Sequence, residues 1–124
     1  MELMDCSLKD HILDWVNTPT EAAKAILPLI TALESAHNFK SAMIHRDIKP
    51  RNILIGKVDG KARAKVSDFG LAKNFQEAGL SGFTATGDMG GTPGYMPREQ
   101  LTDYKNAKPS CDVFSMGATL YELL

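Results

Sequence analysis

The chain has 124 residues, of which 44% are hydrophobic and 23% are charged, a composition typical of one globular domain and not of a disordered segment. Its formal net charge of -1 at pH 7 argues against a protein whose main partner is nucleic acid. The 2 cysteines and 3 histidines show no metal-binding spacing, and no apolar run approaches the roughly 18 residues that span a bilayer. We therefore expect free thiols in a reducing, cytoplasmic setting and no membrane contact from this segment.

Two helices are predicted in the first 40 residues. Residues 7–13 form a short one, with Leu8 and Ile12 on one face. A longer helix is predicted from Pro19 to about Phe39, with Thr18 as N-cap and a kink at Pro28, where a backbone donor is lost. Glu21 is placed to close a capping box with Thr18. The apolar positions of the long helix follow the helical period and predict its core face: Ile26, Leu29, Ile30, Leu33 and Ala36.

Short strands are predicted after the long helix. Residues 42–44 are expected to form a buried strand that pairs with residues 53–55. Residues 56–61 contain Asp59-Gly60, a strong hairpin signal, and are expected to turn the chain into a strand over residues 64–67.

Residues 40–73 carry nine basic and three acidic residues. This local excess suits a phosphate-handling region, although a solvated basic face is the plainer alternative.

Two motifs surround this predicted hairpin. The first is His45-Arg46-Asp47-Ile48-Lys49-Pro50-Arg51-Asn52, and the second is Asp68-Phe69-Gly70. A lone tripeptide recurs by chance, but here both motifs occur in order with a strand pattern leading into Asp68. Together they resemble the catalytic half of the eukaryotic-type (Hanks-type) serine/threonine protein kinases, and the resemblance covers nearly the whole chain. It implies an α+β fold, the mostly helical C-terminal lobe of the kinase fold, with short β-hairpins around the catalytic loop.

The resemblance implies ATP and Mg²⁺ as cofactors and proteins with Ser or Thr as substrates. Phosphoryl transfer needs an acceptor for the hydroxyl proton, a cation at the moving group and oxygen ligands for magnesium. Asp47 would accept the proton, and Lys49 would neutralise charge. Asn52 and Asp68 would hold the metal with oxygen atoms, which magnesium prefers.

Further nucleotide contacts are implied at three positions. Backbone groups of Glu2 and Met4 would pair with the adenine edge at the hinge between the two kinase lobes, although an ordinary chain terminus is the alternative. Leu54 would pack under the adenine ring, and a plain core leucine remains equally compatible with the sequence.

The Gly-, Ser- and Thr-rich stretch over residues 68–99 matches the activation segment of the family, and such long stretches are usually functional. Within it, residues 91–96 match the substrate-docking loop. Thr92 would hydrogen-bond Asp47 and Lys49. A threonine at this position, with lysine at 49, indicates Ser/Thr and not Tyr substrates.

A regulatory pocket is implied by Arg46 and Lys73, which in the family pair with a phosphorylated residue of the activation segment. Asp88 stands where the main phosphothreonine usually lies, while Thr84 and Thr86 lie close by. A carboxylate carries less charge than a phosphate. We therefore expect Asp88 to give basal activity and Thr86 to be the site of further activation, with a solvated turn residue as the alternative for Asp88.

At the end of the activation segment, Arg98 replaces the usual proline and Glu99 is retained, while the arginine that normally pairs with this glutamate would lie beyond Leu124. An unpaired buried glutamate is expected to be destabilising. Asp112 would hold the backbone amides of the catalytic loop, and an exposed aspartate at a helix start is the alternative. Arg51, just before the loop asparagine, stands where members that select basic substrates carry an acidic residue, so a preference for arginine upstream of the target is not supported.

The sequence contains no G-x-G-x-x-G loop and no V-A-I-K strand, the parts that cover and orient the phosphates. We therefore expect residues 1–124 to be a partial kinase domain, from the hinge to the helix that follows the activation segment. A non-catalytic, kinase-like interaction fragment is the alternative, and a nucleic-acid module is a distant third.

Overall fold

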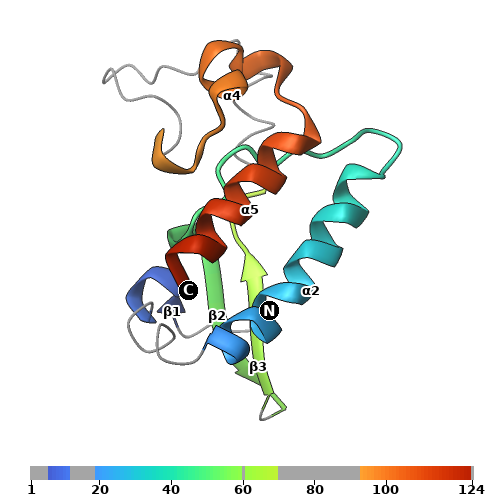
Figure 1. The fold of residues 1–124 in the computed structure, drawn as a ribbon. Coiled ribbons are helices and arrows are strands. Elements are labelled where there is room, and N and C mark those ends of the chain that lie inside the picture. The colour runs from blue at the N-terminus through green and yellow to red at the C-terminus, as the bar shows by residue number, and fades with distance from the viewer. Residues whose placement is uncertain (1–5, 12–18, 60, 70–92, 124) are drawn as a thin grey trace.

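The structure is a computed structural model that describes residues 6–11, 19–59, 61–69 and 93–123 (Figure 1). These ranges contain a three-stranded antiparallel sheet and three α-helices, which agrees with the predicted α+β class. The strands are β1 (Cys6–Ser7), β2 (Ile53–Val58) and β3 (Lys61–Val66), and the helices are α2 (Pro19–His37), α4 (Arg98–Thr102) and α5 (Pro109–Leu123). Four 3₁₀ turns lie between them: η1 (Leu8–His11), η2 (Pro50–Asn52), η3 (Pro93–Tyr95) and η4 (Tyr104–Asn106).

The hairpin of β2 and β3 confirms the prediction from Asp59-Gly60. Ile53 lies opposite Val66 at one end, and Val58 lies opposite Lys61 at the other. Asp59 has a φ of 52°, the left-handed conformation that tight two-residue hairpin turns require. The predicted turn region was too long, because Gly56 and the two residues after it belong to β2.

The strand predicted over residues 42–44 is absent. β2 is the central strand, with β3 along one edge and β1 on the other, where β1 already pairs with Leu54 and Ile55, two of the three expected partners. The amide of Met43 instead donates to the carbonyl of Ala36 near the end of α2, at 3.1 Å. Met43 is 44% exposed, so this connection is neither a strand nor buried.

The short helix predicted over residues 7–13 is also different in the structure. Ser7 pairs with Leu54 in the sheet, and η1 follows from Leu8 to His11. The Ser7 amide and hydroxyl donate to the Asp10 carboxylate at 3.2 and 2.6 Å, which favours a tight turn over a longer helix. Ile12 and the predicted N-cap Thr18 lie outside the described residues.

Helix α2 runs through Pro28 and ends at His37, two residues before the predicted end. The kink at Pro28 stays a prediction. Of the expected core face, Ile26, Leu29 and Leu33 are buried, whereas Ile30 is 43% exposed and Ala36 is half-buried. The core cluster unites this face with residues of η1, the catalytic loop, β2 and α5: Leu8, Ile26, Leu29, Leu33, Ile48, Ile53, Met116 and Leu123.

Helix α5 packs against elements from both ends of the described chain. It packs against α2 along one side and against η3 on the other, while α2 also packs on β3 (Figure 1). Residues 45–52 are thereby held between the sheet and α5. No helix in the described ranges is long and apolar enough to cross a membrane.

Candidate active site

The structure brings three of the predicted catalytic side chains together. The Asn52 side-chain nitrogen donates to the Asp47 carboxylate at 2.9 Å and to the Asp47 backbone carbonyl at 2.8 Å. The Lys49 ammonium lies 2.8 Å from the same Asp47 oxygen, Oδ2. Because the Asn52 amide nitrogen faces Asp47, its oxygen is the atom left for a cation. The turn η2, in which the Asn52 amide donates to the Lys49 carbonyl at 2.9 Å, makes this spacing possible.

Asp112 holds the backbone of the catalytic loop, as the family resemblance predicted. Its two carboxylate oxygens accept hydrogen bonds from the amides of His45 and Arg46, each at 2.8 Å. Asp112 is fully buried, so the alternative of an exposed helix-start residue is wrong. Arg46 has a φ of 68°, which costs energy in a residue with a side chain. The paired acceptors on Asp112 offset part of that cost just before Asp47.

His37, at the end of α2, adds a third contact to the same carboxylate. Its Nε2 lies 2.8 Å from Asp112 Oδ2, and its side chain is 11% exposed. No local sequence pattern predicts this contact, because the two residues are 75 positions apart. The histidine shields the buried carboxylate and supplies it with a polar partner, as a buried charge requires.

Gln100 is a second residue that the sequence did not single out. Its Nε2 donates to the Arg46 carbonyl at 2.6 Å, and the side chain is fully buried. The neighbouring Glu99, expected to be an unpaired buried glutamate, is instead exposed and carries no burial penalty. The Arg46 residue is therefore bonded through its amide to α5 and through its carbonyl to α4.

Asp68 is linked to the catalytic loop through the residue before it. The Ser67 amide and hydroxyl both donate to the Asn52 carbonyl, at 2.8 and 3.2 Å, and the hydroxyl also donates to the Asp68 carboxylate at 3.1 Å. Asp68 is exposed and has a φ of 64°. This conformation turns the chain sharply at the end of β3, next to Asn52.

His45 contacts the same strand end. Its Nε2 lies 2.7 Å from the Ser67 carbonyl. Its ring meets Phe69 edge to face, with centroids 4.8 Å apart and an interplanar angle of 83°, a favourable aromatic arrangement. His45 and Asp68, the first residues of the two motifs, are 23 positions apart in the sequence. In the structure the two motifs are in contact with each other.

The Arg46 guanidinium is buried, with 6% exposure for the whole residue. It lies over the Tyr104 ring, 5.5 Å from the centroid, a cation–π geometry. Burial raises the pKa of Tyr104, and the Arg46 charge acts in the opposite direction. Two guanidinium nitrogens, Nε and Nη1, have no hydrogen-bond partner in the described part of the chain.

Tyr95 anchors the segment that precedes α4. Its hydroxyl hydrogen-bonds the Glu122 carboxylate, and its carbonyl accepts from the Ser115 hydroxyl at 2.6 Å. Both partners belong to α5. Burial, together with the Glu122 hydrogen bond and charge, raises the pKa of Tyr95 to about 12.

Leu54, the predicted adenine contact, is half-buried in β2 opposite Lys65. The remaining predicted site residues lie outside the described residues: Glu2, Met4, Lys73, Thr84, Thr86, Asp88 and Thr92.

The residues at the loop fit magnesium and a nucleotide phosphate by their chemistry. Asn52 offers an amide oxygen and Asp68 a carboxylate, both hard donors of the kind that magnesium prefers. Among the described residues, no group of three His, Cys, Asp or Glu side chains could bind a metal by itself. In phosphoryl transfer, magnesium ions contact phosphate oxygens of the nucleotide as well as protein ligands.

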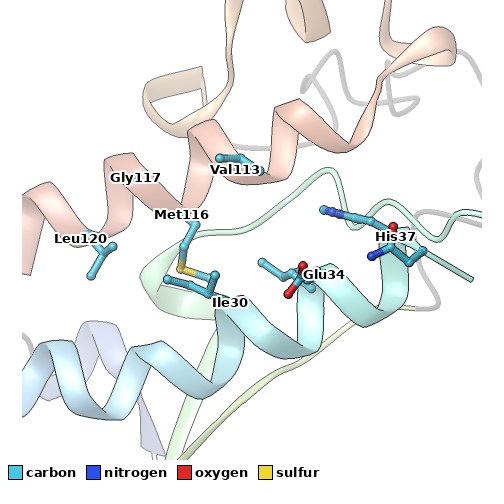
Figure 2. Close-up of a pocket in the computed structure, with 9 residues that line it drawn as sticks. Ile30, Glu34, His37, Val113, Met116, Gly117 and Leu120 are labelled. Atoms are coloured by element: carbon cyan, nitrogen blue, oxygen red, sulfur yellow. The ribbon is translucent and has the colours of Figure 1, made fainter.

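A separate apolar groove lies between α2 and α5, with a volume of about 510 Å³ (Figure 2). Ile30 and Met116 face each other across it, and Leu120 and Val113 extend its α5 wall. None of Asp47, Lys49, Asn52 and Asp68 lines it. Ile30 was expected in the core, but it lines this groove and is therefore partly exposed.

Comparison with known proteins identifies the family of this chain. The family model described as protein kinase domain matches residues 1–124, so the chain belongs to the protein kinase family, in its Hanks-type serine/threonine branch. It is 39% identical over 126 residues to the serine/threonine-protein kinase PknL of Mycobacterium tuberculosis, covering 100% of this chain and 29% of that protein. It is 38% identical over 111 residues to a probable serine/threonine-protein kinase PknB of Corynebacterium glutamicum, covering 90% and 16%. A probable PknB of Lactococcus lactis is 37% identical over 128 residues, covering 100% and 19%. The chain thus spans less than a third of these relatives.

Proposed function

We propose that this chain is part of a serine/threonine protein kinase that transfers the γ-phosphoryl group of ATP to protein hydroxyls with the help of Mg²⁺. Residues 1–124 would form the portion of the kinase domain from the interlobe hinge to the helix after the activation segment. The glycine-rich loop and strand lysine would lie outside this chain. The observation that carries the proposal is the joined arrangement of Asp47, Lys49 and Asn52, with Asp68 linked to it through Ser67.

Each side chain has a separate chemical task in this proposal. Asp47 accepts the proton of the substrate hydroxyl, and its contact with Asn52 fixes the direction of its carboxylate. Lys49, beside Asp47, neutralises charge on the transferred group. Asn52 and Asp68 hold the metal, which when bound offsets the charge of the phosphates.

The nucleotide and substrate contacts extend beyond these four residues. We place the adenine against Leu54 and against backbone groups of Glu2 and Met4. Thr92 would hydrogen-bond Asp47 and Lys49 and so position the acceptor hydroxyl. The half-buried position of Leu54 in β2, the strand that continues directly from the catalytic loop, supports the first assignment.

Regulation would act through Arg46. Its buried guanidinium has two nitrogens without partners among the described residues, and unpaired buried donors are costly. A phosphate on Thr84 or Thr86, or the carboxylate of Asp88, would accept hydrogen bonds from these two nitrogens and would also pair with Lys73. This arrangement would couple the activation segment to the residue that precedes Asp47.

The test is phosphate transfer by the full-length kinase to a peptide that carries one serine or threonine. We expect labelled phosphoserine or phosphothreonine, and Asp47→Asn should lower turnover by about 10²- to 10⁴-fold, the usual contribution of a positioned base. A matched control is Asp103→Asn at the N-cap of η4, an exposed aspartate distant in sequence from the loop, whose carboxylate accepts hydrogen bonds from Asn106. If the wild type bound ATP yet transferred no phosphate to any peptide, the alternative of a non-catalytic, kinase-like interaction module would be favoured.

A further inference from the structure

A second pocket lies beside the catalytic loop and is lined mainly by cations. Its volume is about 240 Å³, and its lining residues, here called the basic pocket, are Lys9, Lys49, Pro50, Arg51 and Tyr95. They come from three places in the fold: η1, the catalytic loop with η2, and η3. The contact between η1 and η2 brings Lys9 next to Arg51 although they are distant in the sequence.

The charge of the basic pocket is only partly balanced. Lys49 pairs with Asp47 at 2.8 Å. Lys9 and Arg51 are exposed, and neither forms a salt bridge with a carboxylate in the described part of the chain. Asp10, the residue next to Lys9, accepts hydrogen bonds from the Ser7 amide and hydroxyl. Lys9 and Arg51 therefore add two positive charges to the pocket beside Lys49, which is already paired.

The basic pocket lies beside Asp47, where the substrate hydroxyl would bind. Lys49 both lines the pocket and contacts the Asp47 carboxylate, so the pocket begins one side chain away from the proposed base. Tyr95 also lines the pocket and belongs to η3, the turn that precedes α4. Consecutive residues of an extended peptide are about 3.8 Å apart. A substrate that presents its hydroxyl to Asp47 would thus place a residue close in its sequence over Lys9 and Arg51.

We infer that this kinase selects substrates with an acidic side chain close to the phosphorylated serine or threonine, and that Lys9 and Arg51 read that side chain. The inference rests on the proposed function and names its substrate class. An arginine presents a planar set of N–H donors that binds a carboxylate in a bidentate manner. A basic peptide would meet like charge at the same place and would be disfavoured.

The test uses the full-length kinase and three peptides that differ only beside the acceptor: glutamates, alanines or lysines at the flanking positions. We expect kcat/KM to fall about five- to tenfold from the glutamate to the alanine peptide, since exposed ion pairs are individually weak, and further for the lysine peptide. Raising the salt concentration should shrink the difference, because exposed charges are screened. Lys9→Glu and Arg51→Glu should each reduce or reverse the preference.

Arg63→Glu is the matched control, an exposed arginine on β3 that does not line the basic pocket. It should leave the peptide preference as in the wild type. Because Arg51 adjoins Asn52, Arg51→Gln and Lys9→Glu provide the measurement if Arg51→Glu does not fold. Equal kcat/KM for the three peptides, or a preference unchanged in Lys9→Glu and Arg51→Gln, would overturn the inference while leaving the kinase activity established. Failure to phosphorylate any of the three peptides would instead count against the proposed function.

Discussion

His37 on α2 and Asp112 on α5 are joined by a contact of 2.8 Å between Nε2 and Oδ2. The same Asp112 carboxylate accepts the amides of His45 and Arg46. One fully buried side chain therefore links two helices to the peptide that precedes the proposed catalytic base. The stability of the helix pair and the geometry of the loop depend on the same group.

Asp112→Asn should lower both stability and activity. The substitution places an amide N–H₂ against backbone N–H groups, so at least one buried donor loses its acceptor, and breaking a buried charged contact costs about 3 kcal/mol. Urea unfolding of the full-length kinase should show the loss, together with a fall in kcat. Glu34→Gln, an exposed carboxylate on α2, is the control and should unfold like the wild type. Equal unfolding midpoints for both variants would mean that Asp112 contributes little to the fold.

Gln100→Leu should reduce kcat with little change in the KM for ATP. Without the 2.6 Å hydrogen bond, the Arg46 carbonyl is left buried and unpaired, which costs about 1–3 kcal/mol. Arg46 can then leave its left-handed conformation and move Asp47. Steady-state kinetics of the full-length kinase measures the effect, with Arg98→Gln, exposed on the same short helix, as control. A purely structural role for Gln100 would lower the melting temperature while kcat per folded molecule stayed constant.

Asp68→Asn and Asp47→Asn should separate binding from chemistry. Asp68 supplies a charged oxygen to the metal, so its substitution should weaken Mg²⁺-dependent ATP binding, whereas Asp47→Asn should leave that binding nearly intact. Calorimetric titration of ATP with and without Mg²⁺ into each full-length variant distinguishes the two. Equal losses of nucleotide affinity would contradict this division of roles.

Alkaline pH should destabilise the protein through Tyr95. Its pKa is raised from 10.0 to about 12 in the fold, so the neutral phenol is favoured and its contribution to stability is complete below pH 10. That contribution is lost as the pH rises from 10 to 12 and the folded protein is forced to ionise the hydroxyl beside Glu122. Denaturant midpoints across this range should fall more steeply for the wild type than for Tyr95→Phe. Parallel curves would show that the hydroxyl is not coupled to folding.

Phosphatase-treated kinase should keep part of its activity through Asp88. A carboxylate carries one negative charge, against about 1.5–2 for a phosphate. Asp88 would therefore replace a phosphate beside Arg46 and Lys73 only in part. Asp88→Ala should abolish this residual activity, and Thr86→Ala should prevent the additional activation that phosphorylation brings. If dephosphorylated Asp88→Ala were as active as the dephosphorylated wild type, Asp88 would have no role in the pocket.

Local patterns in the sequence predicted the parts of the fold that depend on neighbouring residues. The β2–β3 hairpin follows from Asp59-Gly60, and the long helix follows from its apolar period. Strand formation at residues 42–44 could not be judged locally, because it depends on whether β2 has a free edge. The apolar period likewise could not show that Ile30 lines the groove between α2 and α5.

For the candidate site, too, some residues could be predicted from the sequence and others could not. The two motifs and their resemblance to the kinase family led to the prediction of Asp47, Lys49, Asn52 and Asp68, and the structure brings the first three of these side chains together. The anchoring role of Asp112 came from family resemblance alone. Gln100 and His37 carry no recognisable pattern, because their roles arise only when distant helices pack around the loop.

The anchoring of the catalytic loop also sets an order of events during synthesis. Asp112 is made 67 residues after His45, which corresponds to roughly 3–13 seconds at about 5–20 residues per second. Until α5 has been translated, the amides of His45 and Arg46 lack their acceptor and Arg46 has no partner to hold its unfavourable backbone conformation. A nascent chain on the ribosome would therefore carry every residue of the His45–Asn52 motif for several seconds without an assembled loop, so the proposed function would have to wait until α5 had been made.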